Sequence, residues 1–376
     1  MSTTLVHPKD FTQALLQKQL NPVIQVPCTY FKPFIDYLLD TNAIEVISPV
    51  NEAVAMGIAA GRYLATGNIP IVAIQNSGLM NTLNALTSLQ QIYEMPVFYI
   101  ITWRGEGGKG SDVPAHDVTG VQMEQILNTF LLPYEIFDPL KYIDQINALV
   151  TKALETKKPV ALILKKNTFE PYETTEMASK YPMSRYDAML QVKEAYMDEA
   201  VFLSSTGYPS RDSFTIKDTP DFYMVGSMGH VFAAALGLSP FSNKKIVTLD
   251  GDGSCLMHLG GLASFDPKVH TNIIYIVFDN ESYESTGGQP TVSSVVDFKS
   301  IAKAFRFPKY LLASDKKSLQ ECLSQIVGKP GSVFLHIKVK TNIVASGKLP
   351  SDIYSCVEIK DRFMDDFSKA KVPPSS

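Results

Sequence analysis

The segments Lys245–Ser254 (KIVTLDGDGS) and Ile273–Ser282 (IIYIVFDNES) decide the fold class of this chain. Each is an apolar run of strand length that ends in small and acidic residues, and a helical pattern at Leu256–Phe265 lies between them. A strand, a helix and a second strand in this order predict two parallel strands joined by a crossover. The loops after both strands then meet at one edge of the sheet, where ligands of such sheets bind.

The same alternation of apolar runs and amphipathic stretches continues along nearly all of the 376 residues. We predict an α/β fold with two domains of similar size, each a parallel sheet flanked by helices. The polar segment 170–183 (EPYETTEMASKYPM) has no clear period, so it is predicted to link a domain at 1–169 to a domain at 184–376. The predicted strands are Val23–Val26, Ile44–Ile47, Ile69–Ile74, Val97–Thr102 and Val160–Leu164, then Ala200–Ser204, Phe222–Val225, Lys245–Leu249, Asn272–Phe278, Lys309–Leu312 and Val333–Lys338.

Composition excludes several classes of protein. Lys+Arg 34 against Asp+Glu 38 gives a net charge of -4, so no basic excess is available for nucleic acid. The chain has no apolar run of about 18 residues and no signal-peptide pattern at its start, so we expect a cytoplasmic protein without membrane contact. The four cysteines form no CxxC pair and are expected to be buried, reduced thiols.

Asp252 and Asn280 are the strongest candidate metal ligands. The run Asp250–Gly253 alone is typical of an ordinary turn. The next strand, however, ends in Asn280, so the two side chains are predicted to be neighbours at adjacent strand ends. Mg²⁺ prefers oxygen ligands and takes the remainder from phosphates and water. The spacing therefore predicts a Mg²⁺ that bridges a diphosphate, with glycines that let the backbone approach the anion.

A second glycine-rich segment, Gly105–Gly110 (GEGGKG), matches the dinucleotide pattern GxGxxG. A dinucleotide site needs a helix that begins within this turn, and here a helical pattern resumes only at about Gly120. Lys109 precedes glycine rather than Ser or Thr, so the segment is not a P-loop either. We predict instead a mobile loop, Gly105–His116, that closes over a substrate, and a solvated connection remains the alternative.

Three further residues have ordinary explanations beside functional ones. Glu52 opens a predicted helix, where an acidic residue is favoured by the helix dipole. Met228 is the bulky residue of a tight turn and could simply fill a gap in the core. Arg104 follows a predicted strand, where an arginine is ordinarily a solvated surface charge.

Taken together, these segments resemble the thiamine-diphosphate-dependent 2-oxoacid decarboxylases, and within them the phosphonopyruvate and sulfopyruvate decarboxylases. The resemblance implies a pyrimidine-binding domain followed by a diphosphate-binding domain, and the short linker leaves no room for the middle domain of larger relatives. The matching segments are NEAVAMGIAAGRYLATG (Asn51–Gly67), QNSGLMNTLN (Gln75–Asn84), WRGE (Trp103–Glu106), STGYPSRD (Ser205–Asp212), FYMVGSMGH (Phe222–His230), LDGDGSCLMHLGGLA (Leu249–Ala263) and GGQPTV (Gly287–Val292).

The resemblance also implies roles for single residues. Asp252, Asn280 and the Ser282 carbonyl would bind Mg²⁺, and Met228 would bend the thiamine diphosphate. Glu52 would hydrogen-bond the pyrimidine nitrogen and so promote the imino tautomer that reaches the C2 proton. The cofactor that Glu52 meets would be held mainly by another subunit, which implies a homo-oligomer, at least a dimer, with the site at the subunit interface. The residues implied to hold the cofactor are Thr206, Gly207, Gly226, Ser227, Met228, Gly253 and Ser254.

The implied substrate is a small anionic 2-oxoacid. We predict phosphonopyruvate, converted to phosphonoacetaldehyde and CO₂, with sulfopyruvate or a carboligation as alternatives. A charged distal group needs several donors, and Arg104, Lys109 and Ser77 are the candidates, while His116 could handle protons. This chain departs from the family at Asp279, where asparagine is usual, and in the loop after Glu106.

Two other function classes are disfavoured by the residues. A nicotinamide-dependent oxidoreductase would need Gly105–Gly110 as its dinucleotide site. A protein that only binds its ligand would be expected to lack Glu52 or Asp252, and both residues are present.

Overall fold

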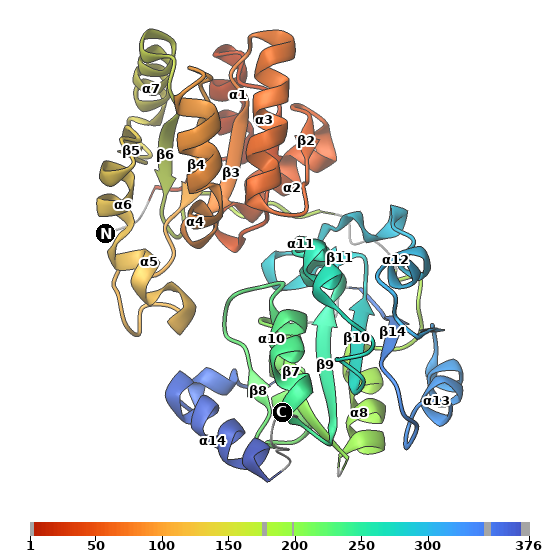
Figure 1. The fold of residues 1–376 in the computed structure, drawn as a ribbon. Coiled ribbons are helices and arrows are strands. Elements are labelled where there is room, and N and C mark those ends of the chain that lie inside the picture. Colours follow the sequence, from red (N-terminus) through yellow and green to blue (C-terminus); the bar gives the residue numbers. More distant parts are fainter. Residues whose placement is uncertain (1–3, 175–178, 198, 342–346, 370–376) are drawn as a thin grey trace. The chain divides into compact units, whose positions relative to one another are not determined.

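The computed structural model describes residues 4–174, 179–197, 199–341 and 347–369, and the chain forms two compact units, Met1–Thr175 and Glu176–Ser376 (Figure 1). The boundary between the units lies inside the segment expected to be a linker. Each unit is built on one six-stranded sheet whose paired strands are all parallel. The predicted α/β class with two parallel sheets flanked by helices is confirmed.

The first unit has the strand order β2-β1-β3-β4-β6-β5. The central strands β3, β4 and β6 are buried on both faces, which is why their sequences read as continuous apolar runs. Strand β5 was not predicted, because it is a three-residue edge strand that is only half-buried. The elements are α1 Pro8–Gln17, β1 Val23–Gln25, α2 Lys32–Thr41, β2 Val46–Ile47, α3 Glu52–Thr66, β3 Ile71–Gln75, α4 Asn76–Ala85, β4 Phe98–Thr102, α5 Asp117–Val121, α6 Met123–Thr129, β5 Tyr134–Ile136, α7 Tyr142–Thr156 and β6 Val160–Leu164.

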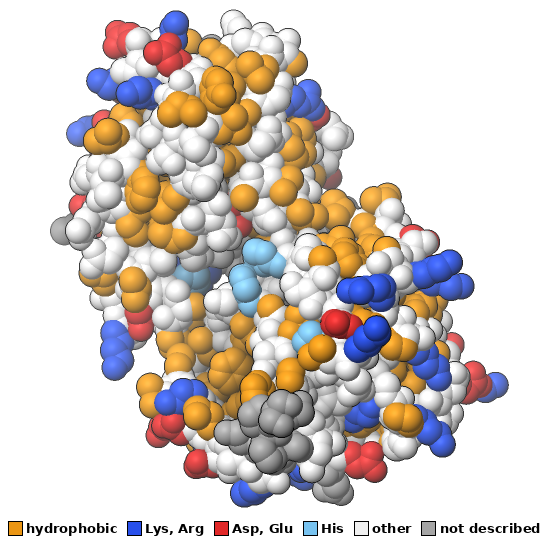
Figure 2. Space-filling view, viewed as in Figure 1, with side chains coloured by type: hydrophobic (Ala, Val, Ile, Leu, Met, Phe, Trp, Pro, Cys, Tyr) orange, Lys and Arg blue, Asp and Glu red, His pale blue; other side chains and the backbone are white. Residues whose placement is uncertain are grey.

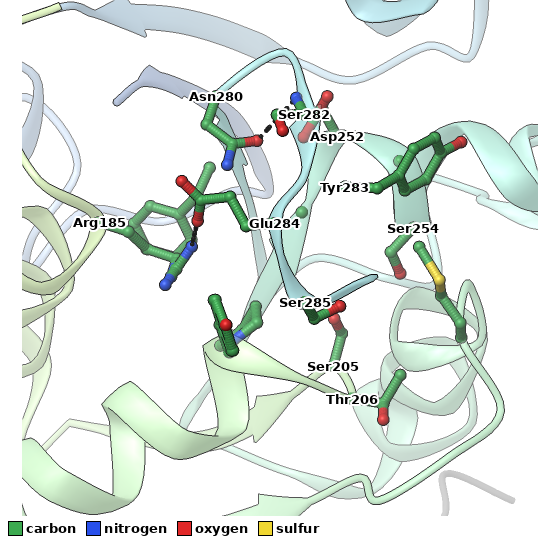
Figure 3. A pocket seen from close by; sticks show the side chains of 16 residues that line it. Arg185, Ser205, Thr206, Asp252, Ser254, Asn280, Ser282, Tyr283, Glu284 and Ser285 are labelled. Atoms are coloured by element: carbon green, nitrogen blue, oxygen red, sulfur yellow. Dashed lines mark hydrogen bonds and ion pairs between the residues drawn. The ribbon is translucent and has the colours of Figure 1, made fainter. Parts of the chain in front are cut away.

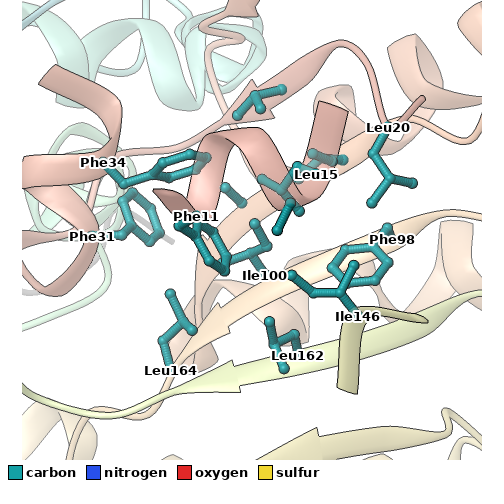
Figure 4. Packing of buried hydrophobic residues seen from close by; sticks show 14 of the residues in the cluster. Phe11, Leu15, Leu20, Phe31, Phe34, Phe98, Ile100, Ile146, Leu162 and Leu164 are labelled. Atoms are coloured by element: carbon teal, nitrogen blue, oxygen red, sulfur yellow. The ribbon is translucent and has the colours of Figure 1, made fainter. Parts of the chain in front are cut away.

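One face of this sheet is covered by α1, α2 and α7, whose apolar side chains form the core with strands β4 and β6 (Figure 4). Phe11 of α1 lies at the centre of this core. Its ring contacts Phe34 of α2 at 5.1 Å and Phe169 at 5.2 Å between ring centroids, both edge-on. Edge-on aromatic pairs add to the burial of their large apolar surfaces, so this face of the unit is rigidly packed.

The second unit has the order β13-β14-β10-β9-β7-β8, which is the order of the first unit when only the strands of each six-stranded sheet are counted from the start of the unit. Two further short strands of this unit pair with each other in a separate antiparallel sheet. Helices α9 and α14 were not predicted; α9 has a proline as its second residue, which the first turn of a helix tolerates. The elements are α8 Arg185–Tyr196, β7 Ala200–Ser204, α9 Tyr208–Ile216, β8 Phe222–Tyr223, α10 Val231–Leu238, β9 Lys245–Gly251, α11 Asp252–Met257, β10 Ile273–Asp279, β11 Ser282–Tyr283, β12 Gln289–Pro290, α12 Phe298–Ala304, β13 Lys309–Ala313, α13 Lys316–Ser324, β14 Val333–Lys338 and α14 Cys356–Ser368.

Two expected helix boundaries were wrong in the same way. The helix expected at Leu256–Phe265 instead starts at Asp252, directly after β9, and gives way to a 3₁₀ turn at Leu259–Ser264. The sequence also predicts a helix at Met80–Gln91; this helix starts at Asn76, directly after β3, and ends in a π-helical turn. Both helices therefore begin in the strand-ending loops, whose polar residues carry no helical period.

Lysine, arginine and acidic side chains are scattered among neutral ones on the face viewed in Figure 2. Among the described residues, the helices are all too short or too polar to cross a membrane. The four cysteines are free thiols; three are buried as expected, but Cys356 is exposed in the first turn of α14, so that expectation was wrong for this residue.

Candidate active site

A pocket lies in the second unit, at the carboxyl ends of β7, β9 and β10 (Figure 3). Strand β7 connects to β8 on one side, and the chain then crosses to β9 on the other side, so this is the point where the strand order reverses. Ligands of open parallel sheets bind at such a point. The residues predicted from the sequence that line the pocket are Thr206, Met228, Asp252, Gly253, Ser254, Asn280 and Ser282.

The three predicted metal ligands lie together at one end of this pocket (Figure 3). Asp252 is buried and accepts a hydrogen bond from the Thr291 hydroxyl. Burial, together with the nearby Asp279 carboxylate, raises the pKa of Asp252. Asn280 Oδ1 accepts a hydrogen bond from the Ser282 N–H at 3.1 Å, and the buried Ser282 Oγ has no protein partner among the described residues.

This donor set fits Mg²⁺ held together with a phosphate-bearing ligand. It offers one carboxylate, one amide and the oxygens of Ser282, which are ligands that Mg²⁺ accepts. The described residues contain no group of three or more His, Cys, Asp or Glu side chains that could hold a metal by themselves. The remaining ligands would therefore come from phosphate oxygens and water.

The loops that start α9 and α11 form the rest of the pocket. Gly207 has a φ of +86°, a conformation that side chains disfavour, and it precedes α9 directly. A Cβ at Gly253 would overlap the ring of Tyr283, so only glycine fits there. Ser254 Oγ accepts a hydrogen bond from the Gly229 N–H at 3.0 Å, which ties the turn of Met228 to this loop.

Three of the predicted cofactor-binding residues do not line the pocket, but each is within two positions of a residue that does: Gly207, Gly226 and Ser227. Gly207 follows Thr206 at the start of α9, and Gly226 and Ser227 precede Met228 in the turn after β8. Their predicted contacts with a cofactor would be made through backbone groups.

Arg185 is a pocket residue that the sequence did not reveal. Its side chain is buried, with Nε 2.8 Å from Asp212 Oδ2 and Nη1 2.7 Å from Glu284 Oε2. Its guanidinium also lies over the ring of Tyr208, 5.3 Å from the centroid. Because these residues are far apart in the sequence, no local motif joins them, although Tyr208 and Asp212 belong to the recognised segment STGYPSRD.

In the first unit, the Glu52 carboxylate is buried rather than exposed as a simple helix-dipole residue would be. Glu52 is the first residue of α3, which Asn51 caps by accepting a hydrogen bond from the Val54 N–H at 2.9 Å. Asn81 Nδ2 donates to Glu52 Oε2 at 2.8 Å, and burial raises the pKa of Glu52. A Cβ at Gly78 would overlap Glu52 Oε1, so the carboxylate occupies space that a glycine leaves open.

Arg104 is half-buried and held by Asp112, so it is not a freely solvated surface charge. Its Nη2 lies 2.5 Å from Asp112 Oδ1, its Nε contacts the same carboxylate, and its guanidinium lies over the Tyr30 ring. The Asn76 side chain fixes its backbone by hydrogen bonds of 2.8 Å and 3.1 Å. Ser77 follows Asn76 in the first turn of α4. The structure thus gathers Arg104, Asp112 and Tyr30 at one edge of the first sheet.

His116 ends a 3₁₀ turn at the far end of the same loop and is buried. Burial, and then the positive charge of Arg104, lower the pKa of His116. Its Nδ1 has no hydrogen-bond partner among the described residues. A neutral imidazole with an unoccupied nitrogen is able to accept a proton.

The loop Gly105–His116 is closed at its base. Trp103 Nε1 donates to the Gly120 carbonyl at 2.8 Å, and a Cβ at Gly120 would overlap the Gly105 carbonyl. Lys109 is exposed at the tip, away from these contacts. Because helix α5 begins only at Asp117, the loop lacks the helix N-terminus that a dinucleotide site requires. The closing motion of this loop stays a prediction.

Comparisons with known proteins give matches in both halves of the chain. The family model described as thiamine pyrophosphate enzyme, N-terminal TPP binding domain, matches residues 9–126, and the corresponding C-terminal TPP binding domain matches residues 210–337.

Three curated relatives are similar to this chain. Phosphonopyruvate decarboxylase of Streptomyces viridochromogenes is 28% identical over 355 residues, which cover 89% of each protein. Sulfopyruvate decarboxylase of Methanosarcina acetivorans is 27% identical, over 92% of this chain and 95% of its own. Sulfopyruvate decarboxylase subunit beta of Methanothermobacter thermautotrophicus is 34% identical over 183 residues, which are 48% of this chain and 94% of that subunit.

Proposed function

Since this chain belongs to the thiamine-diphosphate-dependent 2-oxoacid decarboxylases, which are carboxy-lyases, we propose that its substrate is a small 2-oxoacid with a second anionic group at C3. Phosphonopyruvate is the first candidate, and the products are then phosphonoacetaldehyde and CO₂. The observation that carries the cofactor assignment is the pocket in which Asp252, Asn280 and Ser282 meet a glycine-rich loop.

In this proposal the second unit binds the cofactor. Asp252, Asn280 and the Ser282 carbonyl hold Mg²⁺, and the loops at Thr206 and Gly253 surround the diphosphate. Thiamine diphosphate, when bound, supplies the carbon nucleophile and the electron sink for decarboxylation. Met228 lines the pocket and would bend the thiamine diphosphate, as the family resemblance implies.

Glu52 would hydrogen-bond the pyrimidine ring nitrogen of the cofactor and hold a proton there. Its buried position supports this role, because burial raises the pKa of the carboxyl and brings proton release closer to neutral pH. Glu52 and the pocket belong to different units of the chain, so we propose a homo-oligomer in which the site takes Glu52 from one chain and the cofactor from another.

Arg104 binds the distal anion, with Ser77 and Lys109 as further donors, and His116 accepts or returns a proton. The fixed guanidinium of Arg104 supports this, because an arginine already held in place loses little freedom when it binds an anion. Sulfopyruvate is the second candidate. The similarity of this chain to a sulfopyruvate decarboxylase over most of its length supports this second candidate.

A kinetic panel of phosphonopyruvate, sulfopyruvate, pyruvate and oxaloacetate tests the substrate. We expect the highest kcat/KM for phosphonopyruvate, and product analysis by NMR should show an aldehyde rather than a ligation product. If pyruvate were the best substrate, the assignment of an anion site at Arg104 would be wrong. If the anionic substrate is preferred, Arg104→Ala should reduce kcat/KM for that substrate much more than for pyruvate.

Calorimetry tests the cofactor separately. Thiamine diphosphate should bind in the presence of Mg²⁺ and fail to bind in EDTA, and Asp252→Ala should abolish binding. Binding that is independent of the metal would contradict the assignment of Asp252, Asn280 and Ser282.

A further inference from the structure

Glu281 lies between two proposed metal ligands, Asn280 and Ser282, and has a φ of +62°. Residues other than glycine rarely adopt this left-handed conformation. Here it lets the Ser282 N–H donate to Asn280 Oδ1 at 3.1 Å, and the Glu281 N–H donate to Asp279 Oδ1 at 3.1 Å. The backbone of Glu281 therefore determines how both ligands face the pocket.

The Glu281 side chain is held from outside the pocket. Lys180 Nζ lies 2.7 Å from Glu281 Oε2, Lys338 Nζ lies 3.1 Å from Oε1, and the Tyr181 hydroxyl donates to Oε1 at 3.2 Å. The carboxylate is only 15% exposed, and it does not line the pocket. Its partners Lys180, Tyr181 and Lys338 do not line the pocket either.

Lys338 also fixes the strand that leads into this loop. It lies 2.7 Å from Asp279 Oδ2, and His336 Nε2 contacts the same oxygen at 2.7 Å. Both residues belong to β14, which pairs with β10 so that Lys338 stands opposite Asp279. Hydrogen bonds from His336 and Lys338 outweigh the effect of burial and lower the pKa of Asp279 to about 2. One lysine therefore joins the end of β10 to the left-handed residue two positions later.

We propose, on the basis of the proposed Mg²⁺ site, that Glu281 is a positioning residue: its carboxylate, held by Lys338 and Lys180, keeps the loop in the conformation that presents Asn280 and Ser282 to the metal. Partners outside the ligand shell commonly orient metal ligands in this way, and their loss typically weakens metal binding by about 10–100-fold. Neither Glu281 nor Lys338 touches the metal in this arrangement.

The test is a calorimetric Mg²⁺ titration of the full chain with saturating thiamine diphosphate, and it needs no turnover. We expect Glu281→Ala and Lys338→Met each to weaken Mg²⁺ binding by about 10-fold or more. Glu281→Gly should lose less than Glu281→Ala, because glycine adopts a positive φ without a steric penalty. Thermal unfolding of each variant shows whether it is folded before the titration.

Glu94 provides a matched control. It is also a left-handed glutamate, with a φ of +54°, and it pairs with Lys157 at 3.6 Å in the other unit. Glu94→Ala should leave Mg²⁺ binding unchanged.

If Glu281 and Lys338 acted on Mg²⁺ only through their charges, the two variants would change the Mg²⁺ affinity in opposite directions. Removing Glu281 would weaken Mg²⁺ binding by loss of a negative charge, but removing Lys338 would strengthen it by loss of a positive one. Opposite shifts for the two variants would overturn the positioning role, as would an unchanged affinity in Glu281→Ala. If the wild-type chain with thiamine diphosphate failed to bind Mg²⁺, the proposed function itself would be overturned.

Discussion

Gly78 leaves the space that the Glu52 carboxylate occupies, so a single methyl group can test the role of Glu52. Gly78→Ala needs no unusual backbone conformation, but its Cβ would overlap Glu52 Oε1 and displace the carboxylate. Loss of a positioned proton-transfer group typically costs about 10²–10⁴-fold in rate, and we expect a fall in kcat of this order.

The control for this variant is Gly57→Ala, also in a helix, where nothing lies within 4 Å of the added Cβ. It should retain full activity, and because alanine is favoured in helices it should unfold at a slightly higher temperature. Normal turnover in Gly78→Ala would contradict the assignment of Glu52.

Glu52→Gln is expected to raise stability at neutral pH. Burial raises the folded-state pKa of Glu52 above its ordinary value of 4.5. Above the raised value the folded protein buries a charged carboxylate, and this penalty disappears as the pH falls below the ordinary value, where both states are protonated. The variant should therefore unfold at a higher temperature than wild type at about pH 7.5, with a gap that closes toward about pH 4.5. Thermal unfolding across this range checks it, and a gap that widens in acid would contradict the buried charge.

At the scale of elements, Arg185 joins the start of α8 to α9 and to the rim of the pocket. Arg185→Met would leave Asp212 and Glu284 without the guanidinium that they share in the interior. Breaking a buried ion pair from one side typically costs about 3–5 kcal/mol, and we expect a loss of this size in the free energy of unfolding, measured in urea.

Lys316→Met is the matched control, because it removes a loose, exposed ion pair with Asp187 on the same helix α8. Exposed pairs contribute little, so this variant should be close to wild type. If Arg185→Met were equally harmless, the ion pairs of Arg185 would not be what anchors α8.

The sequence predicted strands correctly where the apolar pattern of the strand itself identifies it. Strands β4, β6, β10 and β14 were predicted almost to the residue, because strands buried on both faces read as apolar runs. Asp252 and Asn280 were predicted to be neighbours from strand order alone, and both line one pocket.

The sequence did not predict features that depend on contacts with another segment of the chain. Strand β5 is short and half-exposed, so its sequence shows no clear alternation, and only pairing with β6 defines it. The cluster of Arg185, Asp212 and Glu284 is assembled from three distant segments. The left-handed backbone of Glu281 depends on lysines that no local pattern connects to it.

At the scale of the whole molecule, two inactive variants should restore each other. Glu52 and Asp252 belong to different units. If a working site combines Glu52 of one chain with Asp252 of another, a mixed dimer of Glu52→Gln and Asp252→Ala contains one intact site. Random pairing makes half of the dimers mixed, so co-expression should recover about a quarter of wild-type activity per site. No recovery would mean that each chain builds its own site.

The shared strand order gives the two units equivalent positions after the ends of their strands, and these positions carry different residues. Counted within each six-stranded sheet, the segments that follow the second, third and fourth strands contain Glu52, Gly78 and Arg104 in the first unit, and Met228, Gly253 and Asn280 in the second. In the proposed function, one architectural position therefore serves catalysis in the first unit and cofactor binding in the second.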